Sequence, residues 1–339
     1  MYSEQIFRIK QKMGGRLKIL AHHYQHDSIV EHADLVGDSL QLASAIPNLE
    51  AEKIIFCGVN FMAETAAALA GPGQMVFAPV PEATCVMADM APARLVETIL
   101  QRLSSRAKVI PLAYVNSSLQ VKDICGRYQG SVCTSANAAG MLDWALSQGD
   151  QVLFLPDQNL GQNTADQLEI SPDEISVLNI KNNGQMIDPG RLAARKLLLW
   201  PGVCAVHYRL KPDTIQKILA ADPQALIIVH PETSPQVVSL AHESGSTSKI
   251  ISFVEKAPPG SRIYIGTEDH LVHRLQKKHK NKHIFSLKVG FCSNMSRTTP
   301  QKLLKCLEKP EPQRAVKIQK DLARNARRSI QTMLKAGSS

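Results

Sequence analysis

A pattern that recurs three times along the chain constrains the fold more than any other feature of the sequence. Short apolar runs, rich in β-branched residues and bounded by turn residues, alternate with helical patterns. This alternation predicts an α/β protein with parallel sheets covered by helices, and with functional loops at the carboxyl ends of the strands. The predicted strands are Lys18–Ala21, Ile54–Cys57, Met75–Ala78, Val109–Ala113, Val152–Leu155, Leu197–Leu199, Ala225–Val229, Ile263–Ile265 and Ile284–Leu287. The predicted helices include Ala63–Ala70, Pro92–Leu103, Ala138–Ser147, Asp213–Ala221 and Pro235–Glu243.

Three stretches of this pattern share the order of their polar residues. Each stretch begins with a strand that ends in a chemically capable residue, and a serine or threonine follows where a helix is expected to start. These pairs are His22 with Ser39, Tyr114 with Ser135, and His230 with Thr247, at spacings of 17, 21 and 17 residues. A second strand with a polar end comes next, and a third strand and a cysteine close the stretch. The second-strand ends are Gly58-Val59-Asn60, Pro156-Asp157-Gln158-Asn159 and Gly266-Thr267-Glu268.

Repetition at this spacing predicts three copies of one structural unit. We therefore predict Rossmann-like αβ units at residues 1–105, 106–222 and 223–310, followed by a basic helical tail at 311–339. The segment Cys125–Gly130 accounts for the longer spacing in the second stretch, and we expect it to form a surface loop.

The cysteines that close the three stretches are Cys85, Cys204 and Cys292, separated by 119 and 88 residues. These separations match no local zinc knuckle and no ferredoxin-type run of cysteines. Three thiolates from three units instead indicate one shared metal centre with an open coordination position. Such a site is compatible with zinc and with a [4Fe–4S] cluster, and the alternative is three small buried residues. The remaining cysteines lack this placement, so we expect them to be packing residues: Cys57, Cys125, Cys133 and Cys306.

The expected helix starts and strand ends supply binding and acid–base groups. Ser39, Ser135 and Thr247 are either ordinary N-caps or donors at helix N-termini, which bind phosphate and carboxylate groups. Titratable side chains at strand ends have pKa values that burial and neighbours can adjust for proton transfer. Those side chains are His22, Tyr24, Tyr114, His207, His230 and Glu232.

The net charge of +9 is concentrated at the C-terminal end of the chain. From Arg274 onward there are 17 Lys/Arg and 3 Asp/Glu, whereas the preceding 273 residues carry 22 and 27. The pattern of residues Lys309–Lys335 predicts one or two solvated helices. Their charged outer face either has no binding role or attracts anionic substrates or an acidic partner.

The sequence has 5% aromatic residues and no nucleic-acid-binding motif, so we expect no nucleic acid partner. The absence of a long apolar run and of a signal peptide predicts a cytoplasmic protein without membrane contact.

Specific motifs along the chain match one known family. They are Ala21-His22-His23-Tyr24, Val36-Gly37-Asp38-Ser39, Gly58-Val59-Asn60-Phe61-Met62-Ala63-Glu64, Tyr114-Val115-Asn116-Ser117, Cys133-Thr134-Ser135-Ala136-Asn137, Pro156-Asp157-Gln158-Asn159, His230-Pro231-Glu232, Gly245-Ser246-Thr247 and Ile265-Gly266-Thr267-Glu268. Over nearly its whole length up to about residue 300, the chain resembles quinolinate synthase, the iron–sulfur enzyme family of NAD biosynthesis.

The resemblance implies three αβ domains about a pseudo-threefold axis and a [4Fe–4S] cluster with one open iron acting as a Lewis acid. The implied reaction condenses iminoaspartate (iminosuccinate) with dihydroxyacetone phosphate to quinolinate, phosphate and two waters. The implied cluster ligands are Cys85, Cys204 and Cys292, and the implied proton-transfer residues are Tyr24, His207 and Glu232. The implied substrate-binding residues are His22, Ser39, Tyr114, Val115, Asn116, Ser135, His230, Pro231, Glu232 and Thr247.

Two other functions remain open from the sequence. One is a [4Fe–4S] hydro-lyase for another small dicarboxylate, which would release no phosphate. The other is a non-catalytic iron–sulfur sensor whose basic tail is the interaction surface. For the quinolinate-forming enzyme, transient contact with an L-aspartate oxidase or dehydrogenase would supply the imine.

Overall fold

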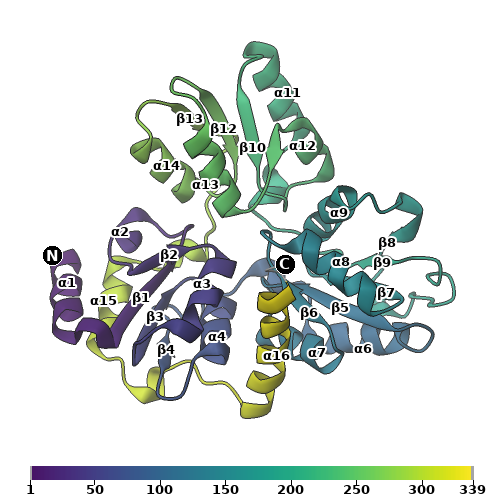
Figure 1. The fold of residues 1–339 in the computed structure, drawn as a ribbon, viewed down its shortest axis with the longest axis horizontal. Helices are drawn as coiled ribbons and strands as arrows, with labels where there is room; N and C mark the ends of the chain where they lie inside the picture. The colour runs from purple at the N-terminus through teal and green to yellow at the C-terminus, as the bar shows by residue number, and fades with distance from the viewer. Residues whose placement is uncertain (1, 337–339) are drawn as a thin grey trace. The chain divides into compact units, whose positions relative to one another are not determined.

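The computed structural model describes residues 2–336 and contains three separate sheets in which every strand pair is parallel (Figure 1). This confirms the predicted α/β class. The strands are β1 (Leu17–His22), β2 (Leu35–Gly37), β3 (Lys53–Cys57), β4 (Met75–Phe77), β5 (Val109–Tyr114), β6 (Ser131–Cys133), β7 (Gln151–Leu155), β8 (Ile175–Val177), β9 (Leu197–Leu199), β10 (Leu226–Val229), β11 (Glu243–Ser244), β12 (Arg262–Gly266) and β13 (His283–Ser286). The helices are α1 (Tyr2–Met13), α2 (Asp27–Val30), α3 (Ser39–Ala45), α4 (Asn60–Leu69), α5 (Val86–Asp89), α6 (Ala93–Leu103), α7 (Leu119–Arg127), α8 (Ala138–Gln148), α9 (Gln158–Gln167), α10 (Lys181–Gly184), α11 (Pro212–Ala221), α12 (Pro235–Leu240), α13 (Thr247–Lys256), α14 (Asp269–Lys278), α15 (Pro300–Glu308) and α16 (Lys320–Ala336).

The three sheets repeat one strand order, which supports the predicted repetition of one unit. The orders are β2-β1-β3-β4, β6-β5-β7-β9-β8 and β11-β10-β12-β13. In each sheet the second strand lies outside the first, and the third strand lies on the other side of the first. The direction of winding therefore reverses beside the first strand, and ligands of open α/β sheets bind at such a reversal.

The chain divides into two compact units. Unit 1 comprises residues 1–85, 213–229 and 241–318, and unit 2 comprises residues 86–212, 230–240 and 319–339. The predicted unit boundaries and the pseudo-threefold arrangement stay predictions. Met1 and residues 337–339, which end the predicted tail, lie outside the described residues.

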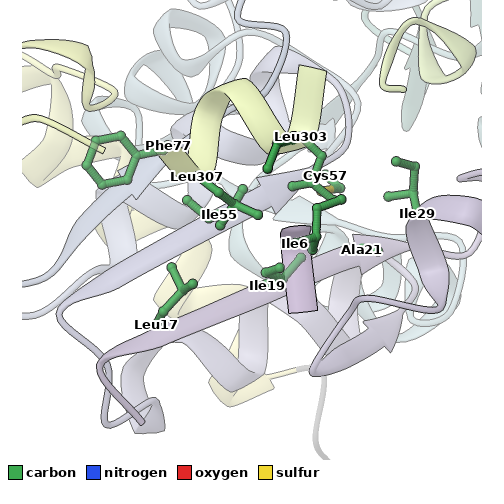
Figure 2. Close-up of a cluster of buried hydrophobic side chains, with 11 residues drawn as sticks. Ile6, Leu17, Ile19, Ala21, Ile29, Ile55, Cys57, Phe77, Leu303 and Leu307 are labelled. Carbon is green, nitrogen blue, oxygen red and sulfur yellow. The ribbon is translucent and has the colours of Figure 1, made fainter. Parts of the chain in front are cut away.

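A continuous apolar cluster holds the first sheet of unit 1 to the helices that cover it. Ile19, Ile55 and Phe77 of the sheet are almost fully buried, and Ile6 of α1 and Leu303 of α15 pack on the same cluster (Figure 2). Two helices from opposite ends of the sequence therefore cover one face of this sheet. A second cluster in unit 1 joins β10 and β12 to α13 and α14 through Ile228, Ile250, Ile263 and Leu271.

In unit 2, helix α16 packs against α7 and β6 (Figure 1). Ala326, Ile330 and Met333 form its buried face. The prediction of a C-terminal helix is therefore confirmed, but only its outer face is solvated. The prediction of a surface loop over Cys125–Gly130 is wrong, because α7 extends to Arg127 and Cys125 is fully buried. Sequence periodicity did not detect α7 because its buried side includes the polar residue Lys122.

A Gly126→Ala substitution should destabilise the packing of α16 on α7. A Cβ atom at Gly126 would lie 2.0 Å from the main-chain oxygen of Asn325, so the two helices would have to separate. We expect the free energy of unfolding to fall by about 1–3 kcal/mol, the usual range for overpacking. The matched control is Gly140→Ala in α8, where nothing lies within 4 Å of the added atom. Urea unfolding should show the control as unchanged or more stable, because alanine favours helix. Equal effects of the two substitutions would contradict the prediction.

The predicted strands lie within about one residue of observed ones. Four short strands were missed, and β11 falls partly where the helix Pro235–Glu243 was predicted, although α12 ends at Leu240. Such short segments carry too few residues to show a period of two. Within residues 2–336, no helix combines the length and apolar character needed to cross a membrane.

Candidate active site

The first strand of each sheet ends in the residues that the sequence marked as reactive. His22 is the last residue of β1, Tyr114 is the last residue of β5, and His230 directly follows β10. His22 and His230 shape their turns in the same way. The backbone N–H of Tyr24 donates to Nδ1 of His22 at 3.1 Å, and that of Glu232 donates to Nδ1 of His230 at 3.3 Å. In a neutral ring, this places the proton of both histidines on Nε2.

A buried carboxylate–imidazole pair is the centre of the site in unit 2. The Nδ1 atom of His207 and the Oε2 atom of Glu232 are 2.6 Å apart, and both side chains are at most 3% exposed. The ring of His207 stacks on that of His230 with 4.6 Å between centroids. Ligand atoms of Cys204, His207 and Glu232 all lie within 4.8 Å of one another. The group therefore combines a thiol, an imidazole and a carboxylate in one place.

Neighbouring polar groups hold the loop that carries Glu232. Asn159 donates to the main-chain oxygen of Glu232 at 3.1 Å, and Asn163 donates to those of Pro231 and Thr233 at 2.8 Å each. The Nε2 atom of His230 lies 3.2 Å from the hydroxyl of Ser135. Since that nitrogen carries the proton, it is free to donate to Ser135 or to a substrate.

The charges within this group are set by burial and by close neighbours. Burial opposes ionisation of Glu232, but His230, His207 and a hydrogen bond from Tyr114 lower the pKa of its carboxyl well below the usual range. Burial and the charge of Glu232 raise the pKa of the fully buried Asp157 well above its usual range. Two adjacent buried carboxyls do not both ionise readily. Glu232 is therefore the ionised member and Asp157 the protonated one.

Mild acid should destabilise the folded chain through His230. Burial lowers the pKa of His230 from 6.5 to about 3. Between these pH values the unfolded chain binds the extra proton and the folded chain does not, so stability falls as pH is lowered from 6.5. At pH 5 the free energy of unfolding should be about 2 kcal/mol lower than at pH 7. Urea unfolding at pH 7 and pH 5 should show this loss, and a His230→Asn variant should show less of it. The same loss in the variant would contradict the assignment.

In unit 1, Tyr24 is held at its hydroxyl. Its oxygen lies 2.7 Å from Oγ1 of Thr267 and accepts a longer hydrogen bond of 3.5 Å from Thr247. Ser248 donates to Asp38 at 2.5 Å, which ties the start of α13 to the start of α3. Ser39 and Thr247 are the first residues of these helices, and Asp38 and Ser246 are the caps. The expectation that helices start there is confirmed, whereas Ser135 lies three residues before α8.

Two other predicted substrate-binding residues have main-chain groups already in use. Val115 donates its N–H to the main-chain oxygen of Cys133 at 2.7 Å, and Pro231 has no N–H to offer. Asn116 is half-buried in the turn after β5.

The three predicted ligand cysteines lie in loops that share one backbone hydrogen bond. In each case the first residue of a helix donates its N–H to the carbonyl of the residue two before the cysteine. The pairs are Asn60 with Ala83 at 2.7 Å, Gln158 with Gly202 at 2.8 Å, and Asp269 with Gly290 at 3.1 Å. Cys85, Cys204 and Cys292 therefore occupy one structural position in three copies.

The environments of the cysteines separate two kinds of thiol. Cys85, Cys204 and Cys292 are partly exposed, as is Cys306, whereas Cys57, Cys125 and Cys133 are buried. Burial raises the thiol pKa of Cys57, Cys125, Cys133 and Cys306, to about 12 for Cys125 and to about 11 for Cys306. Thiolates are the form that binds metal. None of the seven cysteines, all of which are described, is in a disulfide. The three loop cysteines are thus the ones suited to be ligands.

Three residues near this chemistry were not assigned a role from the sequence. They are Asp157, Thr267 and Glu268, all at the polar ends of second strands. The sequence signal was present in those polar ends, but their partners lie far away along the chain.

Reactive side chains at the ends of parallel strands, including a buried carboxylate–imidazole pair beside a thiol, define an α/β enzyme. The model of the family described as Quinolinate synthetase A protein matches residues 4–335. The chain belongs to this family.

Three relatives named quinolinate synthase illustrate the similarity. The protein of Bacillus licheniformis is 43% identical over 343 residues, which cover 97% of this chain and 91% of that protein. The protein of Bacillus velezensis is 43% identical over 340 residues, which cover 98% of this chain and 92% of that protein. The protein of Bacillus subtilis is 40% identical over 338 residues, covering 97% and 92%.

Proposed function

We propose that this chain condenses iminoaspartate with dihydroxyacetone phosphate to form quinolinate, phosphate and two waters. The names of its relatives support this product. The observation that carries the proposal is the 2.6 Å contact between His207 and Glu232 beside Cys204. Condensation, isomerisation and dehydration each require proton transfer, and a buried ionised carboxylate next to an imidazole is suited to it.

The cofactor would be a [4Fe–4S] cluster bound by Cys85, Cys204 and Cys292. Their partial exposure and their equivalent loops fit thiolate ligation, and the raised thiol pKa values of the other cysteines do not. When bound, a cluster with one iron lacking a cysteine ligand would supply a Lewis acid. The reduced thiols that such a cluster needs fit a cytoplasmic location.

The proton-transfer residues would be Glu232, His207 and Tyr24. Nδ1 of His207 lies 2.6 Å from Oε2 of Glu232, so the imidazole can carry a proton whose charge the carboxylate stabilises. Ionised Glu232 can stabilise the positive charge that His207 acquires when its ring takes up a proton from the substrate. The Tyr24 hydroxyl, oriented by Thr267, can return a proton to a substrate oxygen.

The substrate-binding residues would recognise carboxylate and phosphate groups. Thr247 begins the ten-residue helix α13, whose free N–H groups favour an anion. Nε2–H of His230 and, by the same turn geometry, of His22 are further donors. The proposed set also includes the hydroxyls of Ser39, Tyr114 and Ser135 and the amide of Asn116. Val115 and Pro231 complete it through the loops that they shape. Iminoaspartate is unstable in water, so transient contact with an enzyme that oxidises L-aspartate would supply it.

One observation favours a second arrangement. The ligand atoms of Cys204, His207 and Glu232 are close enough to hold a single metal ion, as in catalytic zinc sites with three protein ligands. Metal analysis separates the two. A cluster predicts about four irons per chain, and the single-ion site predicts one metal ion that survives loss of Cys85 or Cys292.

The test is anaerobic turnover of the reconstituted chain. Freshly generated iminoaspartate and dihydroxyacetone phosphate are added, and quinolinate and phosphate are quantified together. Equal amounts of both products support the proposal. A reaction of the iron-loaded chain that consumes a dicarboxylate without releasing phosphate would favour a hydro-lyase. A loaded chain that forms no product would favour a sensor.

A further inference from the structure

The three cysteine loops differ in the residue that caps the neighbouring helix. The N-caps of α4, α9 and α14 are Val59, Asp157 and Glu268. They occupy one position in the three copies, directly before the residue that donates to the cysteine loop. Two of them are carboxylic acids that are fully buried. Burying a carboxyl group is costly, so each is expected to have polar partners that compensate.

Glu268 is bound from both sides. Its Oε1 atom accepts the backbone N–H of Cys292 at 3.2 Å, and its Oε2 atom accepts that of His270 at 2.9 Å. Nδ1 of His270 lies 2.8 Å from Oε1 as well. The adjacent Asp269 accepts the N–H of Gly290 at 2.5 Å. The segment from Gly290 to Cys292 is therefore held by two consecutive acidic residues.

Asp157 has the same relation to the Cys204 loop. Its Oδ1 atom accepts the N–H of Leu160 at 2.8 Å, and the N–H of Cys204 is close enough to lower the pKa of this carboxyl. Gly202 donates to the carbonyl of Pro156 at 3.0 Å, and a Cβ atom on Gly202 would lie 2.4 Å from that oxygen. Only glycine lets the cysteine loop come this close to the Asp157 turn.

We propose that Asp157 and Glu268 are positioning residues for two of the cluster ligands, acting through the backbone N–H groups of Cys204 and Cys292. This inference rests on the proposed cluster. Fixing the N–H fixes the peptide plane and with it the direction of the Cα–Cβ bond that carries the sulfur. The first copy has Val59 at this position, whose side chain cannot accept a hydrogen bond. The cluster is therefore held asymmetrically, with carboxyl support at two of its three cysteines.

The test measures retention of the cluster rather than turnover. Wild type, Glu268→Ala, Glu268→Gln, Asp157→Ala and Asp157→Asn are reconstituted anaerobically, and iron transfer to a chelator is followed over time. We expect the alanine variants to release iron at least about tenfold faster, as is typical when the partner of a metal ligand is lost. The amide variants keep an acceptor oxygen and should fall between. The electron paramagnetic resonance spectrum of the reduced cluster should shift in the alanine variants.

The control is Ser329→Ala, which removes a buried hydrogen bond of 2.9 Å to the carbonyl of Lys122 on α7. The Ser329→Ala substitution should lower thermal stability but leave iron release unchanged.

If Glu268→Ala and Asp157→Ala both showed wild-type release rates and spectra, the inference would be overturned, while the proposed cofactor would stand. Equally fast release in Ser329→Ala would overturn it too, because release would then follow global stability. If the alanine variants do not fold, the amide variants decide in the same way. A wild-type chain that binds no iron would overturn the proposed cofactor and this inference together.

Discussion

A Glu232→Gln variant should form quinolinate about a hundredfold to ten-thousandfold more slowly than the wild-type chain. General acid–base groups contribute this range of rate enhancement. Glutamine keeps the size of the side chain and an oxygen that can accept from His207, but it carries no negative charge to stabilise a protonated His207. The variant therefore removes the carboxylate charge while leaving the 2.6 Å contact with His207 sterically possible. Turnover should be compared under saturating concentrations of both substrates, so that the loss is assigned to kcat.

The matched control for this variant is Glu174→Gln. Glu174 is ion-paired with Lys196 at 2.6 Å, at the surface of unit 2. We expect its turnover to equal that of the wild-type chain. Iron content and circular dichroism should be unchanged in both variants. A Glu232→Gln variant with wild-type kcat would remove Glu232 from the proton-transfer steps.

A Cys204→Ala variant should contain less than about one iron per chain and form no detectable quinolinate. Removing one of three protein thiolates leaves the cluster with too few ligands to be retained. Cys204 also lies beside His207 and Glu232, so loss of its sulfur would remove a ligand from the proposed cluster and from the alternative single-ion site. The measurement is iron and sulfide per chain after anaerobic reconstitution, followed by the turnover assay.

Cys306→Ala is the control that separates ligation from general thiol loss. Cys306 is also partly buried and outside any disulfide, but burial raises its pKa to about 11 and it packs against the apolar cluster of the first sheet. This variant should retain about four irons, the content of one cluster. Full iron content in Cys204→Ala would refute the ligand assignment, and one remaining metal ion in Cys85→Ala would favour the single-ion site.

The local pattern of the sequence predicted the parts of the site but not their pairing. Apolar runs such as Ile54–Cys57 and Leu197–Leu199 are continuous in sequence, so their strands could be located within about one residue. The repeated spacing of His22, Tyr114 and His230 was also visible, because each copy places them at the end of its first strand. Period and turn chemistry depend on near neighbours, which is why both could be read from the chain.

The contacts that give these residues their chemistry span long stretches of sequence. His207 and Glu232 are 25 residues apart, His230 and Ser135 are 95 apart, and Tyr24 and Thr267 are 243 apart. Strand order within each sheet decides which loops become neighbours, and no local pattern encodes that order. For the same reason Asp157 and Glu268 could be seen only as polar strand ends until the cysteine loops were found beside them.

The sequence by itself determined the α/β class, the threefold repetition, the three cysteines at equivalent positions and the family. Only the tertiary structure decided that α7 is buried beneath α16, that Glu232 is ionised while Asp157 is protonated, and that Glu268 accepts the Cys292 N–H. The physical reason is that burial and electrostatic coupling depend on groups brought together by folding, so a residue type alone does not set its pKa or its partner.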